Sequence, residues 1–515
     1  MENSRNGRQA KAIALFGTGS DVGKSILAAG LCRLLHRDGR AVAPFKAQNM
    51  SLNSSVTPAG GEIGRAQALQ AEACGIQPHV DMNPILLKPD SDTSSQVIVR
   101  GKVQTKLEAA AYFQSRLPLF EIVCESYQRL ARQYEVIVIE GAGSAAEVNL
   151  RDRDLVNWPV AHLADAGVLL IADIDRGGVF AQIIGTLDLL APQERHRMIG
   201  IVINKFRGDR ALFDDGVAYI EQRTGLPVLG VIPFLRPLHL DQEDALQIDL
   251  RRSRSFAPEL VNVAVLLLPH MSNFTDFNAF LTEPDVALQY GASPAHVVGA
   301  DVIVIPGTKN TLDDLGYLKR HGFHDAMQAH VQKGMELVGI CGGYQMLGKW
   351  IDDPYAVEAG GKARGLGFLD VMTTLQTDKV TTVVEGVALH MAHPSAFAVR
   401  GYHIHMGETL RRRHGPSFRL TKVSGHHAGS VPEDRLSDGA VREDGLVWGT
   451  YIHGVFDEPE FRRAWLNRLR QRKSLPPLDL SISQAATARQ QSELDRWADH
   501  IKQHLHLTPV WERLR

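Results

Sequence analysis

The sequence predicts an α/β protein with two parallel-sheet domains in one chain. Short apolar runs rich in β-branched and aliphatic residues alternate with amphipathic stretches, first over residues 12–234 and again over 261–454. This alternation is typical of parallel sheets with helices on both faces. The length of 515 residues supports two or more domains, because single domains commonly span about 100–200 residues.

The composition is that of an ordinary globular protein and excludes several classes. Hydrophobic residues make up 44% and charged residues 22%, with a formal net charge of −2, so the overall charge predicts neither a nucleic-acid partner nor a membrane-surface partner. Four scattered cysteines without a CxxC pair do not make a disulfide framework or a structural zinc site. The polar N-terminus and the lack of a long apolar stretch predict no signal peptide, no membrane span and a cytoplasmic location.

The first domain is predicted to span residues 1–235. Apolar runs that read as strands buried on both faces lie at 12–16, 41–45, 135–140, 167–174, 199–204 and 227–234. An amphipathic stretch at 25–39 predicts a helix after the first strand. Residues 236–260 are rich in charge, with a proline near each end, and predict a linker.

A second α/β domain is predicted over residues 261–457. Its apolar runs lie at 261–269, 301–307, 336–343 and 446–454. From residue 458 to 515 the pattern is that of helices, so this tail is predicted as a helical extension.

A phosphate-binding loop, GTGSDVGKS, lies between the first strand and the first helix. It is one residue longer than the strict GxxxxGK[ST] pattern. Backbone N–H groups of such a loop at a helix N-terminus cradle phosphates. Lys24 would reach the β- and γ-phosphates of ATP, and the Ser25 hydroxyl would bind Mg²⁺. The residues predicted to bind ATP here are Gly17, Thr18, Gly19, Val22, Gly23, Lys24 and Ser25. The plain alternative is a glycine-rich turn with a chance Lys-Ser pair.

Further polar residues follow other strands of the first domain. Glu140 ends a strand before a glycine-rich turn and is predicted to bind Mg²⁺ together with the loop serine. Lys46 directly follows a strand and is predicted to contact the nucleotide, and Asn204 resembles part of the Asn-Lys pair that reads a purine base. Asp173 and Asp175 end another strand at the same edge, where ligands bind in open α/β sheets.

A cysteine in the second domain has the setting of a nucleophile. Cys341 lies between a strand and a helix in a G-x-C-x-G frame that parallels the nucleophile elbow. His453 ends the last strand of the same domain and could carry the proton that thiol catalysis requires. The PGTKNT loop at 306–311 could supply backbone N–H groups for an oxyanion hole. The plain alternative is a small buried hydrophobic residue.

A phosphate loop and a thiol elbow in one chain predict an amide-forming enzyme. The sequence also resembles the adenosylcobyric acid synthase family, which comprises the glutamine-hydrolysing amidotransferases of cobalamin biosynthesis. The resemblance extends from residue 17 to about 457 and rests on the strings FKAQNMSLNS, EGAGS, ADIDRGGVF, INKFRGD, PGTKNT, GICGGYQMLG, RGYHIHMGET and GTYIHGVFD. It implies a P-loop domain of the dethiobiotin synthetase type, followed by a class I glutamine amidotransferase domain.

The resemblance also implies an activity. It is the amidation of the b, d, e and g carboxylates of adenosylcobyrinic acid a,c-diamide, with one glutamine and one ATP for each step and Mg²⁺ as the metal. Cys341 would form a glutamyl thioester, and His453 would be the general acid and base. Class I amidotransferases usually carry Glu two residues after this His, where this chain has Val455. The third member is therefore open between Asp457 and a Cys-His dyad.

Three other functions compete with this one. The sibling cobyrinic acid a,c-diamide synthase performs the same chemistry on two carboxylates. A P-loop switch ATPase could carry an inert amidotransferase-like domain, although an intact elbow with His453 speaks against it. A cell-wall precursor amidating enzyme is disfavoured because both halves lie in one chain. The expected partners are glutamine and a corrinoid, and nothing in the sequence predicts an oligomeric state.

Overall fold

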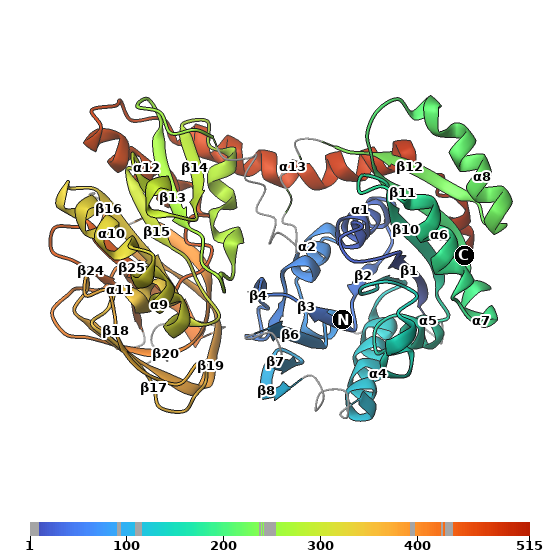
Figure 1. Ribbon diagram of the computed structural model, residues 1–515, viewed down its shortest axis with the longest axis horizontal. Helices are drawn as coiled ribbons and strands as arrows, with labels where there is room; N and C mark the ends of the chain where they lie inside the picture. Colours follow the sequence, from blue (N-terminus) through green and yellow to red (C-terminus); the bar gives the residue numbers. More distant parts are fainter. Residues whose placement is uncertain are drawn as a thin grey trace. The chain divides into compact units, whose positions relative to one another are not determined.

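The computed structural model describes residues 10–89, 94–108, 116–235, 238, 240, 254–391, 397–423, 426–427 and 436–515. The chain forms two compact units (Figure 1). Unit 1 takes the described parts of residues 1–51, 63–244 and 491–515, and unit 2 takes those of 52–62 and 245–490. Each unit is therefore made of more than one stretch of chain, whereas each predicted domain is a single stretch. Most of the predicted linker at 236–260 lies outside the described residues.

Unit 1 is built on a six-stranded parallel sheet in the order β12-β11-β10-β1-β9-β2. Its strands match the predicted apolar runs: β1 Lys11–Gly17, β2 Val42–Phe45, β9 Val136–Glu140, β10 Gly167–Asp173, β11 Met198–Phe206 and β12 Val228–Pro233. The helices are α1 Lys24–Arg37, α2 Arg65–Ala73, α4 Arg116–Gln133, α5 Trp158–Leu163, α6 Val179–Asp188, α7 Pro192–Arg195 and α8 Asp214–Thr224. The predicted parallel α/β class is confirmed.

Alternation along β1 shows why both faces of this sheet are covered. Ile13 and Leu15 are buried in a core cluster with α1 and with the C-terminal helices α13 (Leu480–His504) and α14 (Thr508–Arg513). Ala14 and Phe16 are buried in a second cluster with α4, α5 and α6. Because successive side chains of a strand point to opposite faces, an apolar run without polar interruptions produces a sheet buried on both sides.

The region from residue 48 to 108 contains strands that were not predicted. They form a four-stranded sheet in the order β3-β6-β7-β8 and a two-stranded pair of β4 with β5. The strands are β3 Gln48–Met50, β4 Ser54–Val56, β5 Glu62–Gly64, β6 Ile85–Pro89, β7 Ser94–Val99 and β8 Lys102–Glu108. Residues 52–62, which contain β4, belong to unit 2.

Unit 2 has its own six-stranded sheet in the order β14-β13-β15-β16-β25-β24, parallel except for β24. The strands are β13 Val261–Leu266, β14 Val286–Gly291, β15 Val302–Ile305, β16 Glu336–Ile340, β24 Ala440–Val441 and β25 Val447–Thr450. Its helices α9 Thr311–Arg320, α10 Phe323–Gln332 and α11 Gly342–Leu347 lie together along the sheet (Figure 1).

A second, mixed sheet completes unit 2 and was not predicted. Its long antiparallel pair is β19 Val371–Ala388 with β20 Ala398–Arg411. The other strands are β17 Trp350–Asp353, β18 Gly361–Arg364, β21 Phe418–Val423, β22 His426–His427 and β23 Ser437–Asp438.

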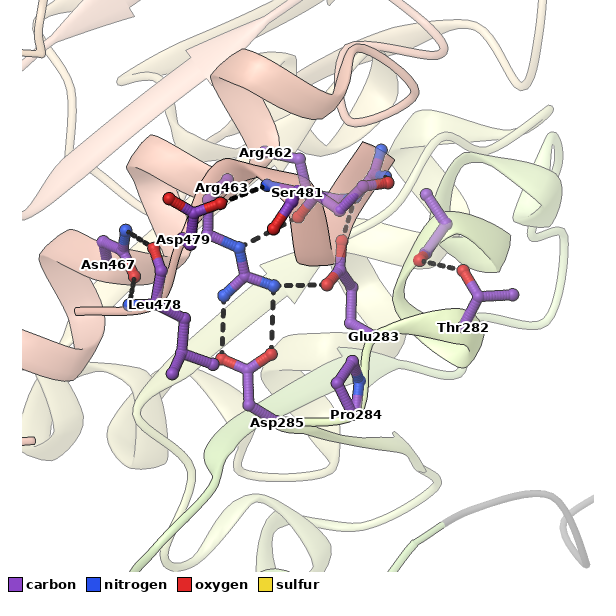
Figure 2. A network of polar contacts seen from close by, with 12 residues as sticks. Thr282, Glu283, Pro284, Asp285, Arg462, Arg463, Asn467, Leu478, Asp479 and Ser481 are labelled. Carbon is purple, nitrogen blue, oxygen red and sulfur yellow. Dashed lines mark hydrogen bonds and ion pairs between the residues drawn. The ribbon is translucent and has the colours of Figure 1, made fainter. Parts of the chain in front are cut away.

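A buried ionic network fixes helix α12 (Pro459–Arg472) to the segment before β14 (Figure 2). Arg462 donates to Glu283 at 2.6 Å, and Arg463 pairs with Asp285 at 3.0 Å and with Glu283. All four side chains are buried, and buried charges persist only when they are paired and hydrogen-bonded. Arg462 also donates to the carbonyl oxygens of Phe456 and Asp457, so the network holds the loop that follows His453.

The C-terminal part of the chain forms the helices α12, α13 and α14. In the part of the chain that the structure describes, no helix is long and apolar enough to cross a membrane.

Candidate active site

The phosphate loop has the conformation that its glycines allow. It joins β1, which ends at Gly17, to α1, which begins at Lys24. Gly23 has φ of 96°, and a Cβ atom there would lie 2.3 Å from the Asn204 side-chain nitrogen. Only glycine fits such a position without strain. Asn204 donates to the Val22 carbonyl at 2.9 Å, so this residue, predicted to read a purine base, holds the loop.

Lys24 bridges the loop and the glycine-rich turn after β9. Its Nζ donates to the carbonyl oxygens of Gly19 at 2.9 Å and Gly143 at 3.0 Å. Thr18 donates through its hydroxyl to Gln182 at 3.3 Å. The Lys24 ammonium adds positive charge at the N-terminus of α1. The helix dipole and the free backbone N–H groups there already favour an anion.

A buried carboxylate, Glu140, gathers donors beside the loop. It accepts from Ser25 Oγ at 2.6 Å, from Lys46 Nζ at 2.8 Å and from Gln70 Nε2 at 2.6 Å. Burial alone would raise the pKa of Glu140, but the Lys46 ammonium and the hydrogen bonds together hold it below its usual value. Glu140 is therefore ionised across the neutral range. The structure brings Ser25, Lys46 and Glu140 together.

The donor set of this cluster fits Mg²⁺. Ser25 Oγ and the Glu140 carboxylate are hard oxygen ligands, and Mg²⁺ typically takes one or two such protein ligands and completes its shell with water and phosphate oxygens. Lys46 contacts the same Oε1 atom that Ser25 contacts, so an ion bound there would share the carboxylate with an ammonium. Within the described residues no group of three or more His, Cys, Asp or Glu side chains could hold a metal on its own.

Asp173 at the end of β10 and Asp175 just after it pair with basic residues at the end of β11. Asp173 accepts from Lys205 Nζ at 2.9 Å. Asp175 accepts from Arg207 at 2.5 and 3.0 Å. These pairs line the predicted strand edge, whereas the cluster with Ser25 is formed by Glu140.

The thiol occupies a strained elbow. Cys341 stands between β16 and α11 with φ of 51° and ψ of −109°, a conformation that costs free energy in any residue with a side chain. A Cβ atom at Gly339 would lie 2.7 Å from the Gly343 backbone, and one at Gly343 would lie 2.0 Å from the Ile305 carbonyl oxygen. The G-x-C-x-G frame is therefore a steric requirement of the turn that presents the sulfur.

His453 connects this thiol to a carboxylate. Its imidazole is buried, and Nδ1 lies 2.8 Å from Asp276 Oδ2. Cys341 is close enough to the same imidazole to raise its pKa. Burial would lower the pKa of His453, but the charge and hydrogen bond of Asp276, with those of Cys341, raise it to about 10. The result is a Cys341–His453–Asp276 arrangement with the geometry of a catalytic triad.

Asp276 is the residue that sequence reasoning missed. The open choice was between Asp457 and a dyad, yet the carboxylate on His453 comes from 177 residues upstream. It is on the 3₁₀ segment η5, Phe274–Thr282, and its second oxygen accepts from the Gly454 backbone N–H at 3.0 Å. No spacing signal could have found it, since the pair meets only in the folded unit.

Two neighbours fix the imidazole and the thiol further. The Tyr402 ring stacks on His453 with a centroid distance of 5.4 Å, and the two backbones exchange hydrogen bonds of 3.1 and 2.9 Å. The Cys341 thiol donates to the Ile404 carbonyl at 3.4 Å. The loop at 306–311 lies beside the imidazole, since a Cβ atom on Gly307 would be 3.2 Å from His453 Cε1.

Comparison with known proteins settles the family. Residues 13–245 match the model of the CobQ/CobB/MinD/ParA nucleotide binding domain, and residues 262–461 match that of the CobB/CobQ-like glutamine amidotransferase domain. Proteins named cobyric acid synthase are similar over nearly the full length: 49% identical in Citrobacter koseri, covering 97% of this chain and 98% of that protein, and 46% identical in Syntrophobacter fumaroxidans, covering 98% of each. The chain belongs to the cobyric acid synthase family.

Membership in the cobyric acid synthase family makes the chain an ATP-dependent ligase of the amidotransferase type in cobalamin biosynthesis. The two matched regions divide the two sites between them. The phosphate loop and Glu140 lie in the nucleotide-binding region, and Cys341, His453 and Asp276 lie in the amidotransferase region. The resemblance inferred from the sequence motifs is confirmed.

Proposed function

We propose that the chain uses glutamine and ATP to amidate the b, d, e and g carboxylates of adenosylcobyrinic acid a,c-diamide, and so forms adenosylcobyric acid. The observation that carries this is the Cys341–His453–Asp276 arrangement in the same chain as a complete phosphate loop. The names of the full-length relatives supply the acceptor class. The free state of all four cysteines agrees with a reducing, cytoplasmic location.

Glutamine would be hydrolysed in unit 2. The Cys341 sulfur attacks the side-chain amide carbon, and the thiol proton, held by His453 as an imidazolium, passes to the leaving ammonia. Asp276 holds the Nδ1 proton, so that Nε2 faces the sulfur. Water then attacks the glutamyl thioester with His453 as base, which releases glutamate and restores the thiol. Backbone N–H groups of the 306–311 loop would stabilise the oxyanion.

The liberated ammonia would be consumed in the ATP-dependent reaction of unit 1. A corrinoid carboxylate oxygen attacks the γ-phosphorus of ATP to give an acyl phosphate and ADP, and ammonia then displaces phosphate to give the amide. Lys24 and the loop N–H groups oppose the charge on the transferring phosphoryl group, and Lys46 would contact the nucleotide. Mg²⁺, when bound by Ser25 and Glu140, would neutralise charge on the ATP phosphates.

Incubation with glutamine, MgATP and the a,c-diamide corrinoid tests this proposal by product mass. We expect four amide groups to be added, with one glutamate and one ADP formed for each. If only cobyrinic acid is accepted and two amides form, the chain is an a,c-diamide synthase. ATP hydrolysis without any glutamate release would instead favour the switch ATPase.

A further inference from the structure

A segment within the nucleotide-binding half of the sequence belongs structurally to the amidotransferase unit. Residues 52–62 lie between β3 and α2 in the sequence, both of which are in unit 1, yet these residues form part of unit 2. They hold strand β4 and the turn that leads to β5, with which β4 pairs. Their contacts in unit 2 reach the neighbours of all three members of the triad.

The first contact concerns the imidazole. The Tyr402 hydroxyl donates to the Ser54 carbonyl oxygen at 3.2 Å, and the ring of the same tyrosine stacks on His453. A shift of the Ser54 backbone would therefore move the ring that packs against the general acid and base.

The second contact concerns the carboxylate. The Ser54 backbone N–H donates to Asn273 Oδ1 at 3.1 Å, and the Phe274 N–H donates to Asn53 Oδ1 at 3.2 Å. Asn273 and Phe274 begin the 3₁₀ segment that carries Asp276. These reciprocal bonds hold the start of that segment in place, as the network of Arg462 and Glu283 holds its end.

The third contact concerns the thiol. Val56 is buried in a small hydrophobic cluster with Tyr402 and Ile404. The Ile404 carbonyl oxygen accepts the hydrogen bond of Cys341 Sγ at 3.4 Å. One short segment thus packs on a neighbour of the nucleophile, a neighbour of the proton carrier and the element of the orienting acid.

The segment is anchored in unit 2 by its own buried ion pair. Glu62 pairs with Lys379 of β19 at 2.5 Å, with side chains that are 0% and 8% exposed. Ser54 Oγ donates to the same carboxylate at 2.8 Å, and Thr381 Oγ1 donates to the Gly60 carbonyl at 2.7 Å.

The chain on both sides of the segment converges on one residue of unit 1. Lys46, before the segment, donates to Glu140, and Gln67 and Gln70, after it, donate to the other oxygen of the same carboxylate. Binding of a cation at Glu140 would compete with these donors. Lys46 and Gln67 lie only a few residues of chain from the two ends of residues 52–62, so a rearrangement of these donors would act on both ends of the segment.

We propose that residues 52–62 are a positioning segment of the glutaminase site, through which nucleotide binding at the Glu140 cluster raises the rate of glutamine hydrolysis. The inference rests on the proposed function of the triad. The segment itself touches no reacting atom and acts through Tyr402, Ile404 and the 3₁₀ segment.

Glutamate release, measured with and without a non-hydrolysable ATP analogue and Mg²⁺, tests the coupling. In the wild-type chain we expect the analogue to raise kcat/KM for glutamine by about fivefold or more, the usual range for coupled sites. In Lys379→Met the segment loses its anchor, and we expect the response to be lost, so that the rates with and without the analogue agree within about twofold. The matched control is Lys422→Met, which removes an exposed ion pair between β21 and Glu385 of the same strand β19 and should keep the full response.

Two further measurements keep the proposal open to refutation. If Lys379→Met is unstable, Thr381→Val removes a single hydroxyl bond to Gly60 and should weaken the response. Hydrogen exchange of residues 52–62 in the wild-type chain should change when the analogue and Mg²⁺ bind. The inference would be overturned if the analogue did not change the wild-type rate of glutamate release, or if the hydrogen exchange of residues 52–62 did not change. It would also be overturned if both variants kept the full response. Complete absence of glutamate release from wild type would instead refute the proposed function itself.

Discussion

In the candidate site of each unit a buried carboxylate lies beside a nitrogen cation, but the two carboxylates serve different chemistry. Glu140 is paired with Lys46 and Asp276 with His453, each at 2.8 Å. Lysine keeps its proton at neutral pH, so the Glu140 pair is a fixed arrangement of charge suited to holding a metal and phosphate. Histidine exchanges its proton, so the Asp276 pair can move a proton to and from a thiol. The partner of the carboxylate, more than the carboxylate itself, decides what each site can do.

The largest effect is expected when the charge of Asp276 is removed from the Asp276–His453 pair. We expect Asp276→Asn to lower the glutaminase rate by about 10⁴-fold, because loss of the orienting acid favours the wrong imidazole tautomer. The pKa of His453 should also fall, since burial lowers it and Asp276 is what raises it. The alkaline limb of the pH–rate profile, where the imidazolium loses its proton, should therefore move to lower pH. An unchanged profile would refute the role of Asp276.

The next effect concerns the phosphate loop. Lys24→Ala should reduce amidation by about 10³-fold with either glutamine or ammonium salt as nitrogen source, because the ammonium opposes charge on the transferring phosphoryl group. Glutamate release measured without ATP should remain near the wild-type rate. Normal amidation in this variant would remove Lys24 from the mechanism.

Removing the charge of Glu140 from the Glu140–Lys46 pair should have a smaller effect, which is confined to the Mg²⁺ dependence of amidation. We expect Glu140→Gln to shift the Mg²⁺ titration of amidation by about 10–100-fold, the usual cost of losing a group around a metal. Basal glutamine hydrolysis without nucleotide should stay close to wild type. A titration identical to wild type would point to Asp173 or Asp175 as the metal ligand.

The smallest effect separates the two carboxylates near His453. Asp457→Asn should change the glutaminase rate by less than about threefold, because Asp276 occupies Nδ1 of the imidazole. A drop of about 10³-fold with the fold intact would show that Asp457 orients the histidine.

The parts of the molecule that the sequence predicted are those whose signal is local. The strands of both parallel sheets are uninterrupted apolar runs, and the glycines around Lys24 and Cys341 satisfy steric needs within a few residues. Asp276 gave no such signal, since it meets His453 only through the fold. The same holds for residues 52–62, which were predicted as part of the first domain, whereas the chain packs them into unit 2.

The most direct test of two separate half-reactions is a paired assay of Cys341→Ala with both nitrogen sources. The account predicts no amidation with glutamine, because the nucleophile is gone. It predicts retained amidation with ammonium salt, increasing with pH as more of it becomes neutral ammonia, because the ATP site in unit 1 is intact. Full activity with glutamine would contradict the account and make the elbow structural. A folded variant that is inactive with both sources would show that Cys341 also serves the ATP-dependent reaction.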